Sequence, residues 1–211
     1  MLEGITTVFF DLGATLVDES RVWQARCREQ AAMAQAKKKH IKSIALQLEM
    51  VKASANLLPP WRTALARYGL SEEAPYRAEH ERLYPDAGRV LSALGGRYTL
   101  GVIANQKEGL SARLEEFGIA KHFSFIISSW DAKCAKPDPQ IFSLALEKAG
   151  CRAENAVMIG DRLDNDIFPA KSLGMKTIWI RQELGGIQTP KDDRYVPDAR
   201  VDSLSEIMNI L

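Results

Sequence analysis

The chain has 211 residues, of which 46% are hydrophobic and 26% charged, as in a globular protein with one large domain or one domain plus an insert. Its net charge of +1 gives no reason to expect binding to nucleic acid or to a membrane surface. The three cysteines (Cys27, Cys134 and Cys151) are widely spaced, which argues against a disulfide framework and a zinc site. Neither a signal peptide nor an apolar run long enough to cross a bilayer is present, so we expect a cytoplasmic protein.

The first predicted element is a short buried strand at residues 8–10, and Asp11 follows it directly. A carboxylate at the end of a buried strand is costly to hold there without a partner. The expected partners are a metal ion, a lysine or backbone N–H groups. A chemical site is therefore predicted at this strand end.

Residues 17–84 are predicted to form a helical domain of about four helices, inserted into a core built from residues 1–16 and 85–211. Apolar side chains recur at helical spacing over residues 41–51 and 61–68. The four tryptophans (Trp23, Trp61, Trp130 and Trp179) are expected in the core rather than at a substrate site, and Trp23 is the best candidate of the four to face the site, because it follows Asp11 closely in the chain.

From Pro85 onward, strands and helices alternate. Several apolar strands separated by helices of about ten residues indicate a parallel sheet that is covered on both faces. Ligands of such sheets bind outside the carboxyl ends of the strands. Strands are predicted at 98–103, 123–128, 156–159 and 176–180, and helices at 86–95, 110–117, 139–149, 165–172 and 203–211.

The residues that follow these strands carry polar chemistry. Asn105 comes after the second predicted strand, and Lys136 comes in the connection after the third. Asp161 and Asp166 follow the fourth. One amide, one ammonium group and several carboxylates are thus expected to meet Asp11 at one edge of the sheet.

Together these segments resemble the haloacid dehalogenase superfamily of hydrolases. The insert stands where that family places its C1-type helical cap, and the resemblance covers the whole alternating part. It implies an α/β fold with a Rossmann-like, doubly wound parallel sheet and an inserted all-helical cap. The matching pieces are Asp11 with Thr15–Leu16, Ile103–Ala104–Asn105, Lys136–Pro137–Asp138–Pro139 with Ile141–Phe142, and Gly160–Asp161 with Asp166.

The resemblance also implies roles for individual residues. Asp11 would be the nucleophile that forms an aspartyl-phosphate, and Mg²⁺ would cancel the repulsion between that carboxylate and the substrate dianion. Lys136 would balance the charge of the nucleophile and the transferred group, and Asp166 would orient Lys136 or a metal-bound water. The implied metal ligands are Asp11, the backbone carbonyl of Gly13, and Asp161, and the implied substrate-binding residues are Asn105, Ala104 and Thr15.

The sequence departs from the family pattern at two positions. Phosphatases of the family usually have a second aspartate where this chain has Gly13, and that aspartate protonates the leaving group and later activates water. A glycine retains its carbonyl for the metal but cannot supply acid–base catalysis, which is worth roughly 10² to 10⁴ in rate. Ala104 stands where the family usually has Ser or Thr, a loss on the order of 1 kcal/mol for one hydrogen bond.

The function we expect is a Mg²⁺-dependent phosphatase acting on a small phosphomonoester, as a monomer or homodimer. One alternative is a 2-haloacid dehalogenase-type hydrolase, for which Arg21, Arg26 and Arg28 are halide-binding candidates by location alone. Another alternative is a catalytically impaired protein that uses the same fold to bind a phospho-ligand or a partner. The retained carboxylates argue against complete loss of the site, whereas Gly13 argues against an ordinary phosphatase.

Overall fold

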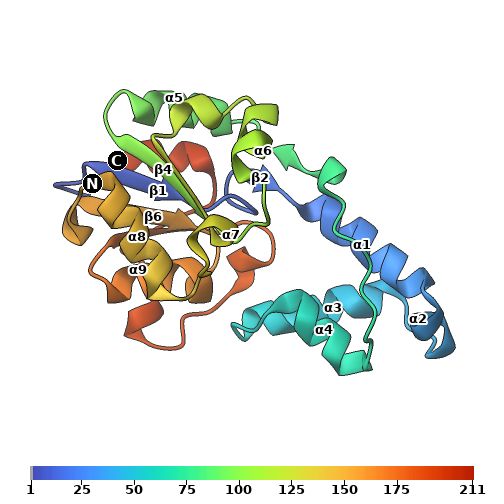
Figure 1. Ribbon diagram of the computed structural model, residues 1–211. Helices are drawn as coiled ribbons and strands as arrows, with labels where there is room; N and C mark the ends of the chain where they lie inside the picture. The colour runs from blue at the N-terminus through green and yellow to red at the C-terminus, as the bar shows by residue number, and fades with distance from the viewer. Residues whose placement is uncertain (1) are drawn as a thin grey trace.

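The computed structural model describes residues 2–211, and its centre is a six-stranded sheet with helices on both faces (Figure 1). The strand order is β5-β4-β1-β6-β7-β8, and every neighbouring pair is parallel. This is the Rossmann-like α/β arrangement that the alternation of elements predicts. The strands are β1 (Thr7–Phe10), β4 (Thr99–Ala104), β5 (Phe125–Ser128), β6 (Ala156–Gly160), β7 (Lys176–Ile180) and β8 (Ala199–Val201).

The core has two layers, one on each face of the sheet. Successive side chains of a strand point to opposite faces, so Val8 and Phe10 pack into one layer and Phe9 into the other. All three are fully buried, as expected for a central parallel strand. Helices α5 and α6 contribute to the first layer, and α8 and α9 to the second. The helices of this part are α5 (Ala87–Gly95), α6 (Leu110–Glu116), α7 (Ser129–Ala132), α8 (Pro139–Ala149) and α9 (Phe168–Ser172).

The ends of α8 coincide with the prediction because local residues define them. The Asp138 side chain accepts a hydrogen bond from the backbone N–H of Gln140, which caps the first turn. Pro139 is the first helical residue. Gly150 ends the helix in the left-handed conformation, with φ of 60°.

Four helices lie beside the sheet and form the helical insert (Figure 1, blue to teal). The insert is connected through a small antiparallel pair of strands, β2 (Val17–Asp18) and β3 (Arg82–Leu83). Its helices pack around their own apolar cluster, which includes Cys27, Met50 and Trp61. The helices are α1 (Ser20–Ala32), α2 (Ala34–Lys38), α3 (Ser43–Ala55) and α4 (Pro60–Tyr68).

Several details differ from the sequence predictions, among them the short elements α7, β2 and β3, which were not predicted. Strand β8 was not predicted, and the helix predicted at 203–211 is a 3₁₀ helix, η7 (Leu204–Asn209), in which Leu204 and Ile207 are buried three residues apart. The helix predicted at 165–172 begins earlier, with a π-helical turn, η4 (Leu163–Ile167).

Within residues 2–211, no helix has both the length and the apolar character needed to cross a membrane. The other short 3₁₀ helices are η1 (Ala78–His80), η2 (Ala120–His122), η3 (Ala153–Asn155), η5 (Gly185–Ile187) and η6 (Asp193–Tyr195).

Candidate active site

Polar side chains from several connections meet at the carboxyl edge of the sheet. Asp11 follows β1, Asn105 follows β4 and Asp161 follows β6. Lys136 reaches the same edge from the segment between α7 and α8, and Asp166 reaches it from η4. Because parallel strands all end at one edge, residues far apart in sequence become neighbours here.

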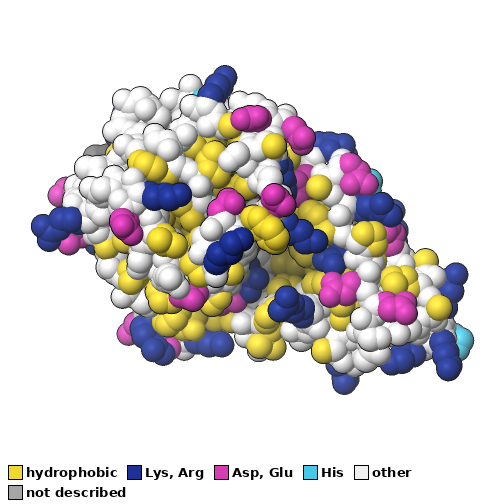
Figure 2. Space-filling view, viewed as in Figure 1, with side chains coloured by type: hydrophobic (Ala, Val, Ile, Leu, Met, Phe, Trp, Pro, Cys, Tyr) yellow, Lys and Arg dark blue, Asp and Glu magenta, His cyan; other side chains and the backbone are white. Residues whose placement is uncertain are grey.

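A cavity of about 770 Å³ opens between this edge and the helical insert. Asp11, Lys136 and Asp161 line it on the sheet side, and Trp23 and Trp61 line it on the insert side. The space-filling view shows the hollow between the two parts, with basic side chains around it (Figure 2). Trp23, the best candidate among the tryptophans, lines the cavity, and so does Trp61, which was expected in the core.

Lys136 is the central charge of the site. Its Nζ atom donates hydrogen bonds to Asp11 Oδ1 and Asp166 Oδ1, each at 2.6 Å. Asn105 fixes the backbone of the lysine, because its Nδ2 donates to the Lys136 carbonyl at 2.7 Å and its Oδ1 accepts from the Lys136 N–H at 2.8 Å. Asn105 thus positions the lysine, a role that the sequence did not reveal.

Burial controls the protonation of these groups. Burial raises the pKa of Asp166 to about 6, although Lys136 opposes this shift. Burial, with Asp166 and Asp11 nearby, raises the pKa of Asp161 well above its usual range. Burial alone would lower the pKa of Lys136, but Asp11 and Asp166 hold it above its ordinary value. The lysine therefore stays charged, and the raised pKa values of Asp161 and Asp166 mean that the site disfavours additional negative charge.

The carboxylates could hold a divalent cation. Asp11, Asp161 and Asp166 each offer an oxygen, and these oxygens lie within 4.8 Å of one another. Both Asp166 oxygens are engaged, one by Lys136 and one by the Arg162 N–H at 3.0 Å. Asp161 is only 4% exposed, yet no group among residues 2–211 donates a hydrogen bond to its carboxylate. A buried carboxylate without a donor fits a hard cation such as Mg²⁺.

The remaining predicted residues are placed differently. The Gly13 carbonyl accepts no hydrogen bond from residues 2–211, and Gly13 lines the cavity, so this oxygen is available to a cation. The side chains of Ala104 and Thr15 are buried and are not among the residues that line the cavity. The structure thus does not bring these two side chains to the cavity surface.

Sequence reasoning missed Glu19, which lies against Gly13. A Cβ atom added at Gly13 would come within 2.6 Å of Glu19 Oε1 and 2.8 Å of Glu19 Cδ. Gly13 does not adopt a positive φ, so its backbone does not require glycine. A side chain at this position would instead have to displace the Glu19 carboxylate from its present place. The only sequence signal was the glycine itself, because Glu19 carries no motif or periodicity of its own.

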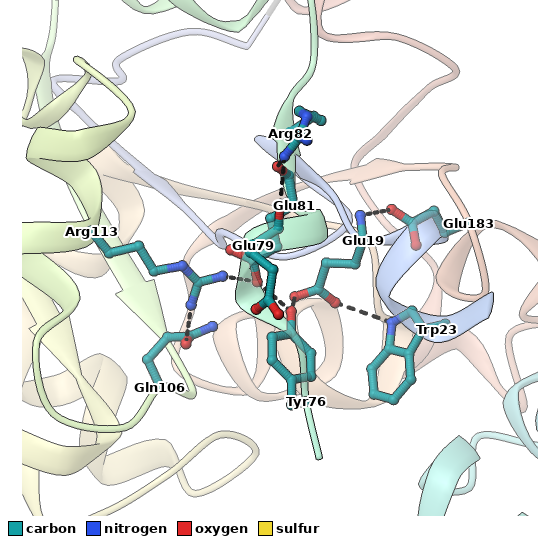
Figure 3. Close-up of polar contacts among 9 residues, drawn as sticks. All are labelled: Glu19, Trp23, Tyr76, Glu79, Glu81, Arg82, Gln106, Arg113 and Glu183. Carbon is teal, nitrogen blue, oxygen red and sulfur yellow. Dashed lines mark hydrogen bonds and ion pairs between the residues drawn. The ribbon is translucent and has the colours of Figure 1, made fainter. Parts of the chain in front are cut away.

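Neighbouring side chains hold Glu19 in place (Figure 3). Its Oε1 contacts the Tyr76 hydroxyl at 2.5 Å, and its Oε2 accepts a hydrogen bond from Trp23 Nε1 at 3.3 Å. The Tyr76 hydroxyl also contacts Glu81, which forms an ion pair with Arg113 of α6. Burial raises the pKa of Glu19 to about 7, although the hydrogen bond from Tyr76 opposes the shift.

An aromatic and basic wall closes the insert side of the cavity. The Arg26 guanidinium lies over the Trp61 ring, 4.3 Å from its centroid, and over Trp23 at 5.6 Å. It also pairs with Glu73 at 2.8 Å and donates to the Ala74 carbonyl at 2.9 Å. Among the three arginines predicted as halide-binding candidates, only Arg26 lines the cavity, and its charge is already engaged.

Comparison with known proteins supports the resemblance. A family model for haloacid dehalogenase-like hydrolases matches residues 8–180. Phosphoserine phosphatase from Thermus thermophilus is 32% identical over 172 residues, which make up 74% of this chain and 68% of that protein. Glyceraldehyde 3-phosphate phosphatase from Methanopyrus kandleri is 34% identical over 134 residues, or 61% of this chain and 56% of that protein.

Solved structures agree on the fold. A structure described as a predicted phosphoglycolate phosphatase from Haemophilus somnus matches with a TM-score of 0.71, covering 100% of this chain and 99% of that one. At 21% sequence identity this likeness shows the fold alone. The matches to the two curated relatives span between about half and two thirds of their lengths.

Proposed function

Because the chain belongs to the haloacid dehalogenase-like hydrolase family, we propose that it is a Mg²⁺-dependent phosphatase acting on a small phosphomonoester. The observation that supports this most strongly is the cluster of Asp11, Lys136 and Asp161 on the cavity wall. In the cluster, Asp11 is the candidate nucleophile and Lys136 supplies a positive charge held in place by its ion pairs. Asp161 adds a buried carboxylate that accepts no hydrogen bond from residues 2–211. The relatives named as phosphatases support the same reaction class.

In this proposal Asp11 attacks the phosphorus atom and forms an aspartyl-phosphate, which water then hydrolyses. Lys136 holds Asp11 in place and offsets negative charge that develops on the transferred group. Asp166 orients the lysine through its 2.6 Å hydrogen bond. When bound, Mg²⁺ would reduce the repulsion between Asp11 and the phosphate dianion, with Asp11, Asp161 and the Gly13 carbonyl as its protein ligands.

We also propose that residues 17–84 act as a cap over the site, carried by the β2–β3 pair and facing the core of residues 1–16 and 85–211. Trp23, Trp61 and Arg26 on the cap side form the wall that a substrate's organic part would contact. The cavity volume of about 770 Å³ suits a small metabolite. A cytoplasmic location and a monomeric or dimeric state stay predictions from the sequence.

The dehalogenase alternative has less support in this site. Halide binding needs an unpaired positive group, and Arg26 is already paired with Glu73. The Asp161 carboxylate accepts no hydrogen bond from residues 2–211, which fits a cation ligand better than it fits a metal-independent site. Phosphoryl transfer uses both the lysine and this carboxylate.

The test is phosphate release from p-nitrophenyl phosphate and a panel of small phosphomonoesters, with Mg²⁺ or with EDTA. We expect turnover only with Mg²⁺, and a loss of at least about 10³-fold for Asp11→Asn. The exposed Asp192, which pairs with Arg194, supplies the matched control Asp192→Asn, which should keep full activity. Metal-independent halide release from 2-chloropropionate, without phosphate release, would replace this proposal with the dehalogenase.

A further inference from the structure

The proposed phosphatase reaction needs a proton donor at the leaving oxygen, and the catalytic cluster does not provide one. An alkoxide is a poor leaving group unless a side chain protonates it as the P–O bond breaks. No histidine lines the cavity among the described residues. The carboxyl side chains that line it are Asp11, Glu19, Glu73, Asp161, Asp164 and Glu183.

Two of these carboxyl groups are already engaged in ion pairs with arginines. Glu73 pairs with Arg26 at 2.8 Å, and Asp164 pairs with Arg162. Asp11 and Asp161 already serve as nucleophile and cation ligand in the proposed function. That leaves Glu183, which accepts hydrogen bonds from the Glu19 N–H at 2.8 Å and from a tyrosine hydroxyl, and Glu19 itself.

Glu19 is the one that lies against the loop carrying the nucleophile. Its carboxylate fills the place where a side chain at Gly13 would begin, two residues after Asp11. A carboxyl group reaching this place from the start of α1 substitutes in space for one that residue 13 cannot offer. The glycine and the glutamate therefore form one arrangement, because any side chain at position 13 would displace the Glu19 carboxylate.

Hydrogen bonds connect Glu19 to the residues around it (Figure 3). The Tyr76 hydroxyl contacts both Glu19 and Glu81, but it has a single proton and can donate to only one of them. Glu81 forms an ion pair with Arg113, and the Trp23 indole N–H donates to the other Glu19 oxygen. These contacts hold the Glu19 carboxyl group on the cavity wall beside Gly13.

We propose that Glu19 is the general acid and base of this enzyme, an inference that rests on the proposed phosphatase function. In the first step a bond forms between an Asp11 oxygen and phosphorus, and the bond between phosphorus and the substrate oxygen breaks. The Glu19 carboxyl transfers its proton to that oxygen, which leaves as the alcohol. In the second step the Glu19 carboxylate takes a proton from water as the water oxygen bonds to phosphorus, and the Asp11–phosphorus bond breaks to release phosphate.

A purely structural role for Glu19 makes a different prediction. A residue that only holds Trp23 and Tyr76 would affect all substrates alike when replaced. A proton donor matters most when the leaving group is a strong base, and little for p-nitrophenolate, which leaves without a proton. The dependence on the leaving group therefore separates the two roles.

The experiment compares Glu19→Gln with wild type on p-nitrophenyl phosphate and on glycerol 2-phosphate, both with Mg²⁺. We expect kcat/KM to fall roughly 10²- to 10⁴-fold for the alkyl ester and less than about tenfold for the aryl ester. The double variant Gly13→Asp with Glu19→Ala removes the old carboxyl and supplies one from position 13, and should recover alkyl phosphate turnover relative to Glu19→Ala alone. Glu49→Gln, on α3 and paired with Lys52, is the matched control and should match wild type.

Two further measurements show that the site is intact without relying on turnover. Orthovanadate binding and the thermal midpoint of Glu19→Gln should stay close to wild type, because glutamine keeps the shape and one acceptor oxygen. Equal losses on both esters, or none, in a variant that binds vanadate would overturn the role of Glu19 while leaving the phosphatase function in place. Absence of Mg²⁺-dependent phosphate release in wild type would instead overturn the proposed function, and this inference with it.

Discussion

Replacing Lys136 with methionine tests how the buried charges of the site are balanced. Lys136 is 4% exposed, and its ammonium group lies 2.6 Å from both Asp11 and Asp166. Methionine keeps most of the apolar stem and removes the charge. The variant leaves the oxygens of Asp11, Asp161 and Asp166 within 4.8 Å of one another, with no cation between them.

The size of the effect follows from these distances. At an effective dielectric constant of about 20, each 2.6 Å pair contributes an attraction of about 6 kcal/mol. Removing the ions from water costs several kcal/mol for each, which offsets much of this attraction. Losing one member of such a buried set typically costs about 3–5 kcal/mol, so we expect that loss in the free energy of unfolding at pH 7.5 without divalent cations.

Urea unfolding in EDTA, followed by tryptophan fluorescence, measures the loss. The control is Lys176→Met, because the Lys176 side chain is 44% exposed and lies 3.8 Å from Asp198. That exposed pair should contribute less than about 1 kcal/mol. Mg²⁺ should restore part of the stability of Lys136→Met, since a cation among the carboxylates replaces the missing charge. If the two variants lose the same small amount, the reasoning about an uncompensated buried cluster is wrong.

Two other variants test the cation site and the buried acids. Asp161→Asn should abolish the stabilisation that Mg²⁺ gives to the wild type, which is about 2.7 kcal/mol at 100 times the dissociation constant; an equal thermal shift in both proteins would contradict this. Burial raises the pKa of Glu183 from 4.5 to about 7, so the native state binds more protons than the unfolded state between those values, and stability falls as pH rises through that window. Glu183→Gln keeps an acceptor for Glu19 and Tyr84 but cannot ionise, so it should remove up to about 3 kcal/mol of that fall. Urea unfolding of wild type and Glu183→Gln at pH 5 and pH 8 measures this fall in the free energy of unfolding. If the variant shows the same pH dependence as wild type, Glu183 is not its source.

Parts of the fold that short-range rules define could be predicted from the sequence. Asp138, Pro139 and Gly150 mark the ends of α8, and both ends of that helix match the prediction. β7 is a continuous run of mostly apolar residues and also matches. β8 could not be found in this way, because it has only three residues, and exposed Arg200 interrupts it. Its pairing with β7 depends on the chain returning to the sheet edge.

In the candidate site, too, some residue positions could be predicted from the sequence and others could not. The meeting of Asp11, Lys136 and Asp161 was predictable, since Asp11 and Asp161 directly follow strands, Lys136 lies in the connection after β5, and parallel strands end at one edge. The position of Glu19 was not, because Tyr76, which holds it, lies 57 residues further along the chain. The hydrogen bonds between Asn105 and the Lys136 backbone likewise depend on how two loops pack against each other. Local sequence patterns do not predict such packing.

The attachment of the insert through β2 and β3 has a consequence for how this architecture can diversify. The two chain crossings are adjacent and hydrogen-bonded, so the ends of the insert are neighbours, and its length or content can change without altering the sheet. Asp11 and Lys136 are encoded outside this segment, whereas Trp23 and Trp61 are encoded within it. Replacing or altering the insert could therefore change the residues proposed to contact the substrate without changing Asp11 or Lys136. Glu19 lies immediately after the first crossing, β2. An exchange of the insert that begins after Glu19 would replace the aromatic and basic wall of the cavity and would retain the proposed proton donor.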